Sequence, residues 1–189
     1  MTVQSFIALL EENPIISAVK NDDELFHAIK SSCGAVILLY GNALNIGVLV
    51  QTVKSSGKCC LVHIDLVEGL SQSTVAVDFI AQSTLADGMI STKPQIVRHA
   101  KQKGILTIQR FFIIDSKALD NAKRQLDGCE ADIVEILPGV MPKVTAELSK
   151  CSRKPLIASG LIRDKEDVVS AISCGALAVS STNSDVWFL

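Results

Sequence analysis

Five ionisable side chains lie within or at the ends of aliphatic runs of this chain: His63, Asp65, Lys93, Arg110 and Glu135. An unpaired charge inside an aliphatic core costs several kcal/mol, so such groups either pair with one another or bind a polar ligand. For any one of these residues, a structural ion pair such as Lys93–Glu135 or Arg110–Asp65 is as good an explanation as ligand binding. For the set of five, a binding site for a polar ligand is the better interpretation.

A second group of small and hydroxyl-bearing residues ends two other aliphatic runs. Ser159-Gly160-Leu161 ends one run, Ser180-Ser181-Thr182 ends the other, and Ser184 and Asp185 then open a terminal turn. Small residues let backbone N–H groups approach an anion, and the start of a short helix adds a positive end. We predict a phosphate site here, with a hydroxyl-rich strand end and helix cap as the structural alternative.

Elements that could position these residues alternate along the whole chain. Eight short aliphatic runs read as strands: 15–19, 35–41, 59–66, 88–93, 106–114, 133–137, 156–160 and 176–182. Seven amphipathic stretches between them read as helices: 22–31, 45–56, 74–83, 94–103, 116–127, 139–151 and 164–173. This alternation indicates an α/β fold of right-handed βαβ units with parallel pairing.

The chain length selects one α/β architecture. The 189 residues leave about 24 for each of eight units, enough for a strand, a helix and two short loops. We therefore predict one domain, residues 1–189, folded as a minimal (β/α)8 TIM-type barrel whose last helix is truncated to the turn at 184–189. An open doubly wound sheet would stop at five or six strands, and neither G-x-G-x-x-G nor a P-loop occurs.

Barrels of this type place function at the C-terminal ends of their strands. The two-residue alternation of strands points five side chains into the barrel near that end: His63, Asp65, Ser91, Lys93 and Glu135. Gln109 and Arg110 face opposite sides of their strand, and both of its faces are largely apolar. We expect Arg110 to join the others in a ring around the barrel mouth.

Charge and hydropathy exclude several classes of protein. The net charge is −2 and the sequence pI about 5.9, which lacks the basic balance of an electrostatically driven nucleic-acid binder. Any nucleic-acid contact must be local, and the basic segments 98–103 and 150–154 are the candidates. The longest apolar run, Ala35–Tyr40, is too short to span a membrane. The acidic pair Glu11 and Glu12 argues against a signal peptide, so we expect a cytoplasmic protein.

Five ordered segments resemble the glycerol uptake operon antiterminator regulatory family: 62–70, 88–93, 109–116, 157–162 and 175–187. The resemblance implies a cytoplasmic regulator that binds glycerol-3-phosphate and acts on the untranslated leader of messenger RNA, preventing premature transcription termination. It implies no catalytic residue, metal or cofactor. Ser159 stands where the family usually has glycine, and the order of Ser180-Ser181-Thr182 is permuted. A serine Cβ at position 159 would crowd a phosphate, whereas its hydroxyl would donate to it.

The favoured hypothesis is therefore a ligand-sensing RNA-binding regulator. The phosphate would lie at Ser159–Leu161 and Ser180–Thr182. The mouth residues Asp65, Lys93, Arg110 and Glu135 would meet the glycerol hydroxyls, with His63 beneath. Contact with leader mRNA would be gated by the effector, and a homo-oligomer is compatible with this scheme.

Two alternatives remain open at this stage. A small barrel enzyme, an isomerase or lyase acting on a sugar or triose phosphate, would use Lys93 as Schiff-base or general-acid residue and Glu135 as base. A metal site at His63, Asp65 and Glu135 has suitable ligand types but no spacing signature.

Overall fold

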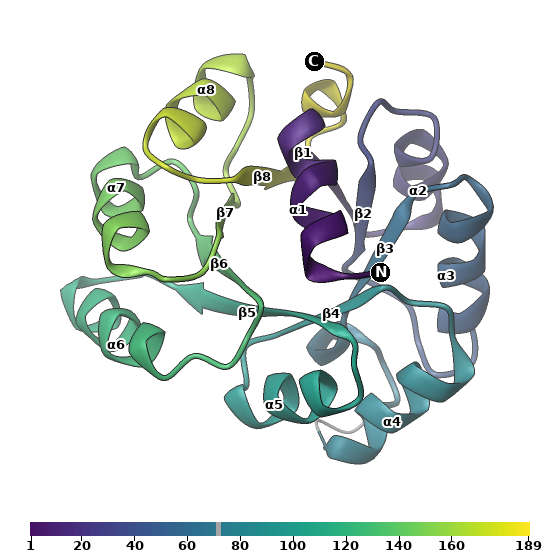
Figure 1. Cartoon of the computed structure of the whole chain (residues 1–189). Helices are drawn as coiled ribbons and strands as arrows, with labels where there is room; N and C mark the ends of the chain where they lie inside the picture. Colours follow the sequence, from purple (N-terminus) through teal and green to yellow (C-terminus); the bar gives the residue numbers. More distant parts are fainter. Residues whose placement is uncertain (71–72) are drawn as a thin grey trace.

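Eight parallel strands close into a barrel in chain order, β1 to β8 (Figure 1). The computed structural model describes residues 1–70 and 73–189. Its strands are β1 (Ile15–Val19), β2 (Ala35–Leu38), β3 (Cys59–His63), β4 (Gly88–Ser91), β5 (Leu106–Phe112), β6 (Ile133–Leu137), β7 (Leu156–Ser159) and β8 (Ala178–Ser181). The predicted fold class is confirmed.

The helices surround this barrel (Figure 1). Those that follow strands are α2 (Asp22–Ala28), α3 (Ile46–Ser55), α4 (Thr74–Ser83), α5 (Pro94–Gln102), α6 (Ser116–Asp127), α7 (Pro142–Cys151) and α8 (Lys165–Ser173). The final unit has only a 3-10 turn, η2 (Ser184–Phe188), so the expected truncation of the last helix is present. None of the described helices is long and apolar enough to cross a membrane.

One helix was absent from the sequence-based expectation. Helix α1 (Val3–Glu12) precedes the first strand, and the Thr2 side chain caps it by accepting a hydrogen bond from the Ser5 N–H. Phe6 and Leu10 on this helix are buried and pack with the apolar side chains inside the barrel. Because α1 lies across the N-terminal ends of the strands, it closes that end of the barrel (Figure 1).

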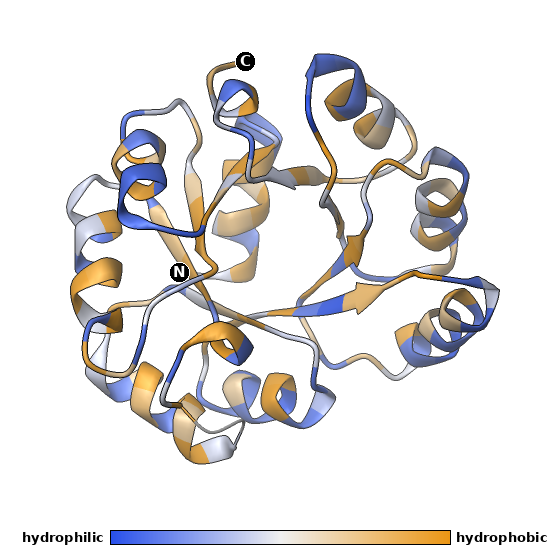
Figure 2. Cartoon of the chain, turned by 180° about the vertical axis from the view of Figure 1, so that it is seen from behind, coloured by the Kyte–Doolittle hydropathy of each residue, from blue (hydrophilic) through white to orange (hydrophobic). Residues whose placement is uncertain are grey.

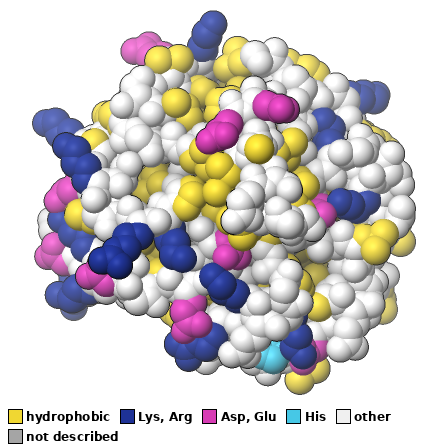
Figure 3. All heavy atoms as spheres, in the orientation of Figure 1, with side chains coloured by type: hydrophobic (Ala, Val, Ile, Leu, Met, Phe, Trp, Pro, Cys, Tyr) yellow, Lys and Arg dark blue, Asp and Glu magenta, His cyan; other side chains and the backbone are white. Residues whose placement is uncertain are grey.

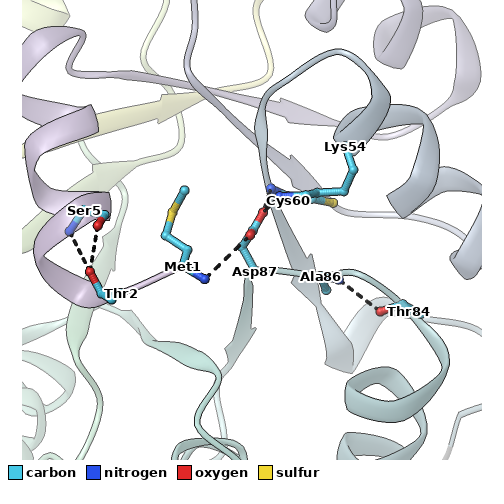
Figure 4. Close-up of polar contacts among 8 residues, drawn as sticks. All are labelled: Met1, Thr2, Ser5, Lys54, Cys60, Thr84, Ala86 and Asp87. Carbon is cyan, nitrogen blue, oxygen red and sulfur yellow. Dashed lines mark hydrogen bonds and ion pairs between the residues drawn. The ribbon is translucent and has the colours of Figure 1, made fainter.

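A carboxylate beside this closed end links three segments of the chain (Figure 4). Asp87 accepts hydrogen bonds from the Cys60 N–H at 2.9 Å and from Lys54 Nζ at 2.6 Å. The Met1 amino group lies 4.0 Å from the other carboxylate oxygen of Asp87. Asp87 therefore ties α3 and the N-terminus of the chain to β3 at this end.

Two apolar layers fill the molecule, one inside the barrel and one between strands and helices. Figure 2 shows hydrophobic residues along most of the strands, whereas hydrophobic and hydrophilic residues alternate along the surrounding helices. Ile90 belongs to the inner layer and Met89 to the outer one. Strand alternation then places Ser91 on the outer face, so the prediction that Ser91 points into the barrel was wrong. Because both faces of β4 are apolar, its sequence has no alternation of polar and apolar residues that would show which side chains point inward.

Several strands end earlier than expected, most informatively β3. The run 59–66 is a strand only to His63, and Ile64–Leu66 forms a 3-10 turn, η1. Ile64 remains 4% exposed in this turn, so its apolar side chain reflects packing rather than strand geometry. Asp65 therefore lies on a turn beside β4 and not on an inward position of β3.

The C-terminal turn η2 holds a fully buried aromatic side chain, Trp187. Its indole Nε1 donates to the Ser181 carbonyl at 2.8 Å, and its own carbonyl accepts from the Ser32 hydroxyl at 3.1 Å. These bonds tie the end of the chain both to β8 and to the loop that enters β2.

Candidate functional site

A buried ion pair forms the centre of the barrel mouth. Arg110 on β5 and Glu135 on β6 are partners in the register of these strands. Arg110 Nε donates to Glu135 Oε2 at 2.6 Å, and the two side chains are 8% and 0% exposed. Arg110 therefore faces the barrel interior, as expected for the ring. Of the alternative pairings considered, neither Lys93–Glu135 nor Arg110–Asp65 is formed among the described residues.

Two serines complete the hydrogen bonding of the Glu135 carboxylate. The Ser159 hydroxyl lies 2.5 Å from Glu135 Oε1, and the Ser180 hydroxyl lies 3.3 Å from the same oxygen. The two hydroxyls are also 2.7 Å apart. Glu135 thus has an arginine on one oxygen and hydroxyl groups on the other, so both oxygens of this buried carboxylate accept hydrogen bonds.

A small cavity of about 70 Å³ opens above this network. Arg110, Ser159, Gly160, Ser180 and Thr182 line it, together with the apolar side chains of Ala18, Leu39 and Leu137. The terminal guanidinium nitrogens of Arg110 donate to no other residue in the described part of the chain. The cavity therefore combines unused N–H donors with an apolar wall, which suits a small anionic or hydroxylated ligand.

His63 lies deeper in the barrel and is 3% exposed. Its Nδ1 has no hydrogen-bond partner among residues 1–70 and 73–189. Burial, followed by the positive charge of Arg110, lowers the pKa of His63 to about 4. The ring is therefore neutral at pH 7, and its position under the charged network agrees with the placement expected for it.

The loop after β7 has an unusual backbone. Gly160 and Leu161 both have positive φ, +79° and +63°, and Leu161 is the one non-glycine residue with this geometry in the described chain. A left-handed conformation costs a residue with a Cβ about 1–2 kcal/mol, and such strain concentrates at functional sites. The N–H groups of Leu161 and Ile162 donate to no described acceptor.

An open groove of about 400 Å³ runs beside this loop. Two short segments line it, Leu161–Arg163 and Ser181–Asn183. Thr182 lines both this groove and the cavity above Arg110, so the two spaces adjoin. The predicted phosphate residues therefore come together, although they are divided between the two spaces.

Three of these residues are serines whose hydroxyl groups already form hydrogen bonds within the protein. Ser159 and Ser180 point inward to Glu135, whereas Ser181 faces outward and donates to the Ile162 carbonyl at 2.7 Å. The start of the terminal turn is also occupied, because the Asn183 side chain accepts from the Asp185 N–H at 3.1 Å. Backbone groups of the β7 loop remain the best anion donors here.

Asp65 and Lys93 lie outside the central network. Asp65 accepts hydrogen bonds from the Ser91 hydroxyl at 2.7 Å and from the Thr92 N–H at 2.8 Å. Burial alone would raise the pKa of Asp65, but the hydrogen bonds from Thr92 and Ser91 outweigh it and lower the pKa. Lys93 is the N-cap residue of α5 and half-buried, and its ammonium donates to no described residue. Lys93 does not line the cavity above Arg110, and its place in the ring around the mouth stays a prediction.

The metal alternative is not supported by this geometry. No group of three His, Cys, Asp or Glu side chains in the described residues comes together as a metal site. Asp65 is bonded to the β4 end and Glu135 to Arg110, which holds the two carboxylates in separate networks.

Gly139, which sequence reasoning missed, shapes the loop after β7. The Gly139 N–H donates to the Gly160 carbonyl at 3.0 Å, and a Cβ on Gly139 would lie 2.9 Å from the Ser159 nitrogen. Only glycine allows the loop after β6 to lie this close to the end of β7. The Pro138-Gly139 pair directly after a strand was the available signal.

Comparisons with known proteins give one consistent result. Residues 15–187 match the sequence model of a family described as glycerol-3-phosphate responsive antiterminator. The chain is 43% identical over 181 residues to the uncharacterized protein YgcP of Escherichia coli strain K12, covering 96% of this chain and 95% of that protein.

Two solved structures agree in both sequence and fold. A glycerol uptake operon antiterminator regulatory protein from Listeria monocytogenes is 32% identical with a TM-score of 0.89, covering 93% of this chain and 95% of that one. A glycerol uptake operon antiterminator-related protein from Thermotoga maritima is 31% identical with a TM-score of 0.79, covering 92% and 96%.

Proposed function

Because this chain belongs to the glycerol-3-phosphate responsive antiterminator family, we propose that it binds glycerol-3-phosphate at the barrel mouth and thereby controls its action on leader mRNA. The observation that carries the proposal is the Arg110 guanidinium. It is held by Glu135, has unused N–H donors and opens into a small cavity. Its free N–H donors can bond hydroxyl oxygens, while the groove that adjoins the cavity can take the anionic end of the same ligand.

The two adjoining spaces match the two parts of the effector. The glycerol hydroxyls would lie in the cavity with Arg110 and Ser180, and the phosphate would lie in the groove on the N–H groups of Leu161 and Ile162. Thr182 lines both spaces, so its hydroxyl would contact the ligand where the two parts meet. Arg163 on the groove wall would add a positive charge for the phosphate.

The positions of two residues argue against the barrel-enzyme alternative. Lys93 is the N-cap residue of α5 and does not line the cavity above Arg110. Glu135 is bonded to one guanidinium and two hydroxyls. A general base must reach the substrate proton. We therefore propose a sensor without catalysis, and we expect no turnover of triose phosphates.

Regulation requires that the effector bind the RNA-competent and RNA-incompetent states with different affinity. The strained loop after β7 is the element in contact with the groove that is best placed to change. We propose that phosphate binding selects one arrangement of this loop, and that the arrangement sets the affinity for the leader transcript. Copies of the chain would associate as a homo-oligomer if the RNA contact is shared.

Ligand binding is tested by calorimetry and thermal unfolding with glycerol-3-phosphate, glycerol and inorganic phosphate. We expect glycerol-3-phosphate alone to stabilise the protein, by about 2.7 kcal/mol at 100 times its dissociation constant. Thr182→Val should weaken binding about tenfold, since it removes one hydrogen bond to a charged group. Thr145→Val is the matched control, because Thr145 is buried in α7 with no partner for its hydroxyl. Equal responses to all three compounds would refute the effector assignment.

RNA action is tested separately with a transcript of the leader that precedes glycerol-utilisation genes. We expect binding to change on addition of glycerol-3-phosphate and to weaken between low and moderate salt. Absence of any binding, with and without the effector, would overturn the RNA part of the proposal and leave the ligand part standing.

A further inference from the structure

A groove of about 230 Å³ lies on the outside of the barrel between α5 and α6, away from the mouth. Its lining includes Arg98 on α5, Arg124 and Gln125 on α6, Gln109 on β5, and Cys129 and Glu130. Figure 3 shows several lysine and arginine side chains over α5 and α6, with aspartate and glutamate side chains among them. The mouth site makes no use of these residues.

Gln109 is the unusual feature of this groove. It lies on the outer face of β5, where the residue two positions later, Phe111, packs in the apolar layer, and it is 3% exposed. Its Oε1 accepts a weak hydrogen bond from the Cys129 thiol at 3.5 Å. Its amide nitrogen donates to no described residue, although the side chain lines the groove. This nitrogen is not among the fully buried atoms that lack a partner, so the donor is accessible from the groove and available to a ligand there.

The charge around Gln109 favours an anionic chain. Two arginines line the groove against a single carboxylate among its described lining residues, and that carboxylate, Glu130, is 2.7 Å from Arg98 Nε. Arg124 is exposed and contacts only the neutral Asn121. The charges of Lys154 and Lys101 also reach Cys129, where they oppose the rise in the pKa of its thiol that burial causes.

We propose that this groove binds a single-stranded RNA segment, with Arg98 and Arg124 on backbone phosphates and the Gln109 amide on the edge of an inserted adenine. An amide offers a donor beside an acceptor, which matches the acceptor and donor that adenine presents side by side. Unstacked bases of single-stranded RNA are recognised by such edge contacts and by stacking on guanidinium planes. This inference rests on the proposed function, which supplies RNA as the partner.

The location also links the two sites. Gln109 and Arg110 are consecutive residues of β5, one facing the groove and the other facing the effector cavity. A movement of Arg110 on ligand binding would shift the Gln109 backbone directly. No long chain of intervening contacts is required for the effector to alter RNA affinity.

The test uses the full chain with fluorescein-labelled 12-nucleotide RNAs of each base and with the leader transcript. The wild type should prefer the adenine oligonucleotide. Gln109→Leu should weaken adenine binding roughly 5- to 150-fold and reduce the preference, since one bidentate contact is lost. Arg124→Ala should weaken all four RNAs alike and lower the salt slope by about 0.7. Lys165→Ala on α8 removes an exposed charge far from the groove and should leave all affinities unchanged.

The outcomes separate this inference from the proposed function. If the wild type binds the leader and the groove variants bind it equally well, the groove is not the RNA site, although the function stands. The same conclusion follows if Gln109→Leu weakens all four bases alike. If the wild type binds neither leader nor oligonucleotides, the RNA part of the proposed function fails together with this inference, and only the ligand part stands. Arg124→Ala changes only an exposed side chain, so its result does not depend on the folding of the Gln109 variant.

Discussion

At the scale of single residues, the barrel mouth is organised around one carboxylate whose two oxygens both accept hydrogen bonds. Glu135 receives Arg110 on one oxygen and serine hydroxyls on the other, so the charged network is complete before any ligand binds. What remains for a ligand is the outer part of Arg110. The sequence could predict that Glu135 and Arg110 belong to the same mouth. It could not predict that they pair, because strand register decides which residues lie opposite each other.

Removing either partner of this pair should be costly. Glu135→Gln leaves a buried guanidinium without its counter-charge, and Arg110→Met leaves a buried carboxylate with only hydroxyl donors. We expect each to lower the free energy of unfolding by about 3–5 kcal/mol. The double variant should lose clearly less than the sum. Urea denaturation of all four proteins measures the coupling, and simple additivity would show that the pair contributes nothing specific.

The buried His63 predicts a dependence of stability on pH. Its pKa is about 4 in the folded protein against 6.5 for the ordinary side chain, so below pH 6.5 the unfolded state binds more protons. Stability should therefore be unaffected above pH 6.5 and should fall by about 3 kcal/mol as the pH drops from 6.5 to 4. Denaturation of wild type and His63→Gln across this range measures it, and parallel curves would contradict the assignment.

At the scale of elements, the sequence identified every strand and the seven helices between strands. Its boundaries at β1, β6, α4 and α6 agree with the structure. The largest errors are at other boundaries: β2 and β3 end about three residues earlier than expected, α7 begins three residues later, and α2 ends three residues earlier. At β3 the apolar residues continue into the turn η1 because this turn is packed. Ser91 was misplaced for a related reason, since a strand buried on both faces gives no alternation from which to assign sides.

The left-handed glycine of the β7 loop gives a test at this scale. Gly160 and Gly57 have nearly the same φ, +79° and +80°, but only Gly160 lies at the mouth. We expect Gly160→Ala and Gly57→Ala each to lower the free energy of unfolding by about 1–2 kcal/mol. A Cβ at Gly160 would also meet Leu137 Cδ2 at 3.3 Å, whereas one at Gly57 meets nothing within 4 Å.

Only one of these two variants should affect ligand binding. Gly160→Ala should weaken glycerol-3-phosphate binding, because it displaces the loop that offers the N–H groups, and Gly57→Ala should bind normally. Calorimetric titration of both proteins checks this. Normal binding by Gly160→Ala would place the phosphate elsewhere.

Helix α1 shows what the sequence reasoning left out. Phe6 is fully buried at the closed end of the barrel, where it packs in the same layer as Leu106 and Ile133 of the strands. Phe6→Ala should create a cavity and lower the free energy of unfolding by about 3–5 kcal/mol. Chemical denaturation measures this loss, and the fold should persist. A loss below 1 kcal/mol would mean that the barrel interior does not depend on α1.

At the scale of the whole molecule, the net charge of −2 limits how RNA can be bound. Two or three basic contacts on a single strand give a slope of about −1.4 to −2.1 for log affinity against log salt. We expect a slope in this range for the leader transcript, measured by fluorescence anisotropy at several salt concentrations. A slope several times steeper would require a much larger basic surface than the α5–α6 face offers.

The C-terminal turn gives the molecule a built-in optical reporter. Trp187 is the single tryptophan of the chain, is fully buried, and donates to the carbonyl of Ser181, whose hydroxyl in turn holds the Ile162 carbonyl beside the proposed phosphate groove. Indole fluorescence therefore reports on the surroundings of Trp187, which two successive hydrogen bonds connect to Ile162 beside the strained loop. Its emission spectrum can follow loop rearrangement in real time, without any attached dye.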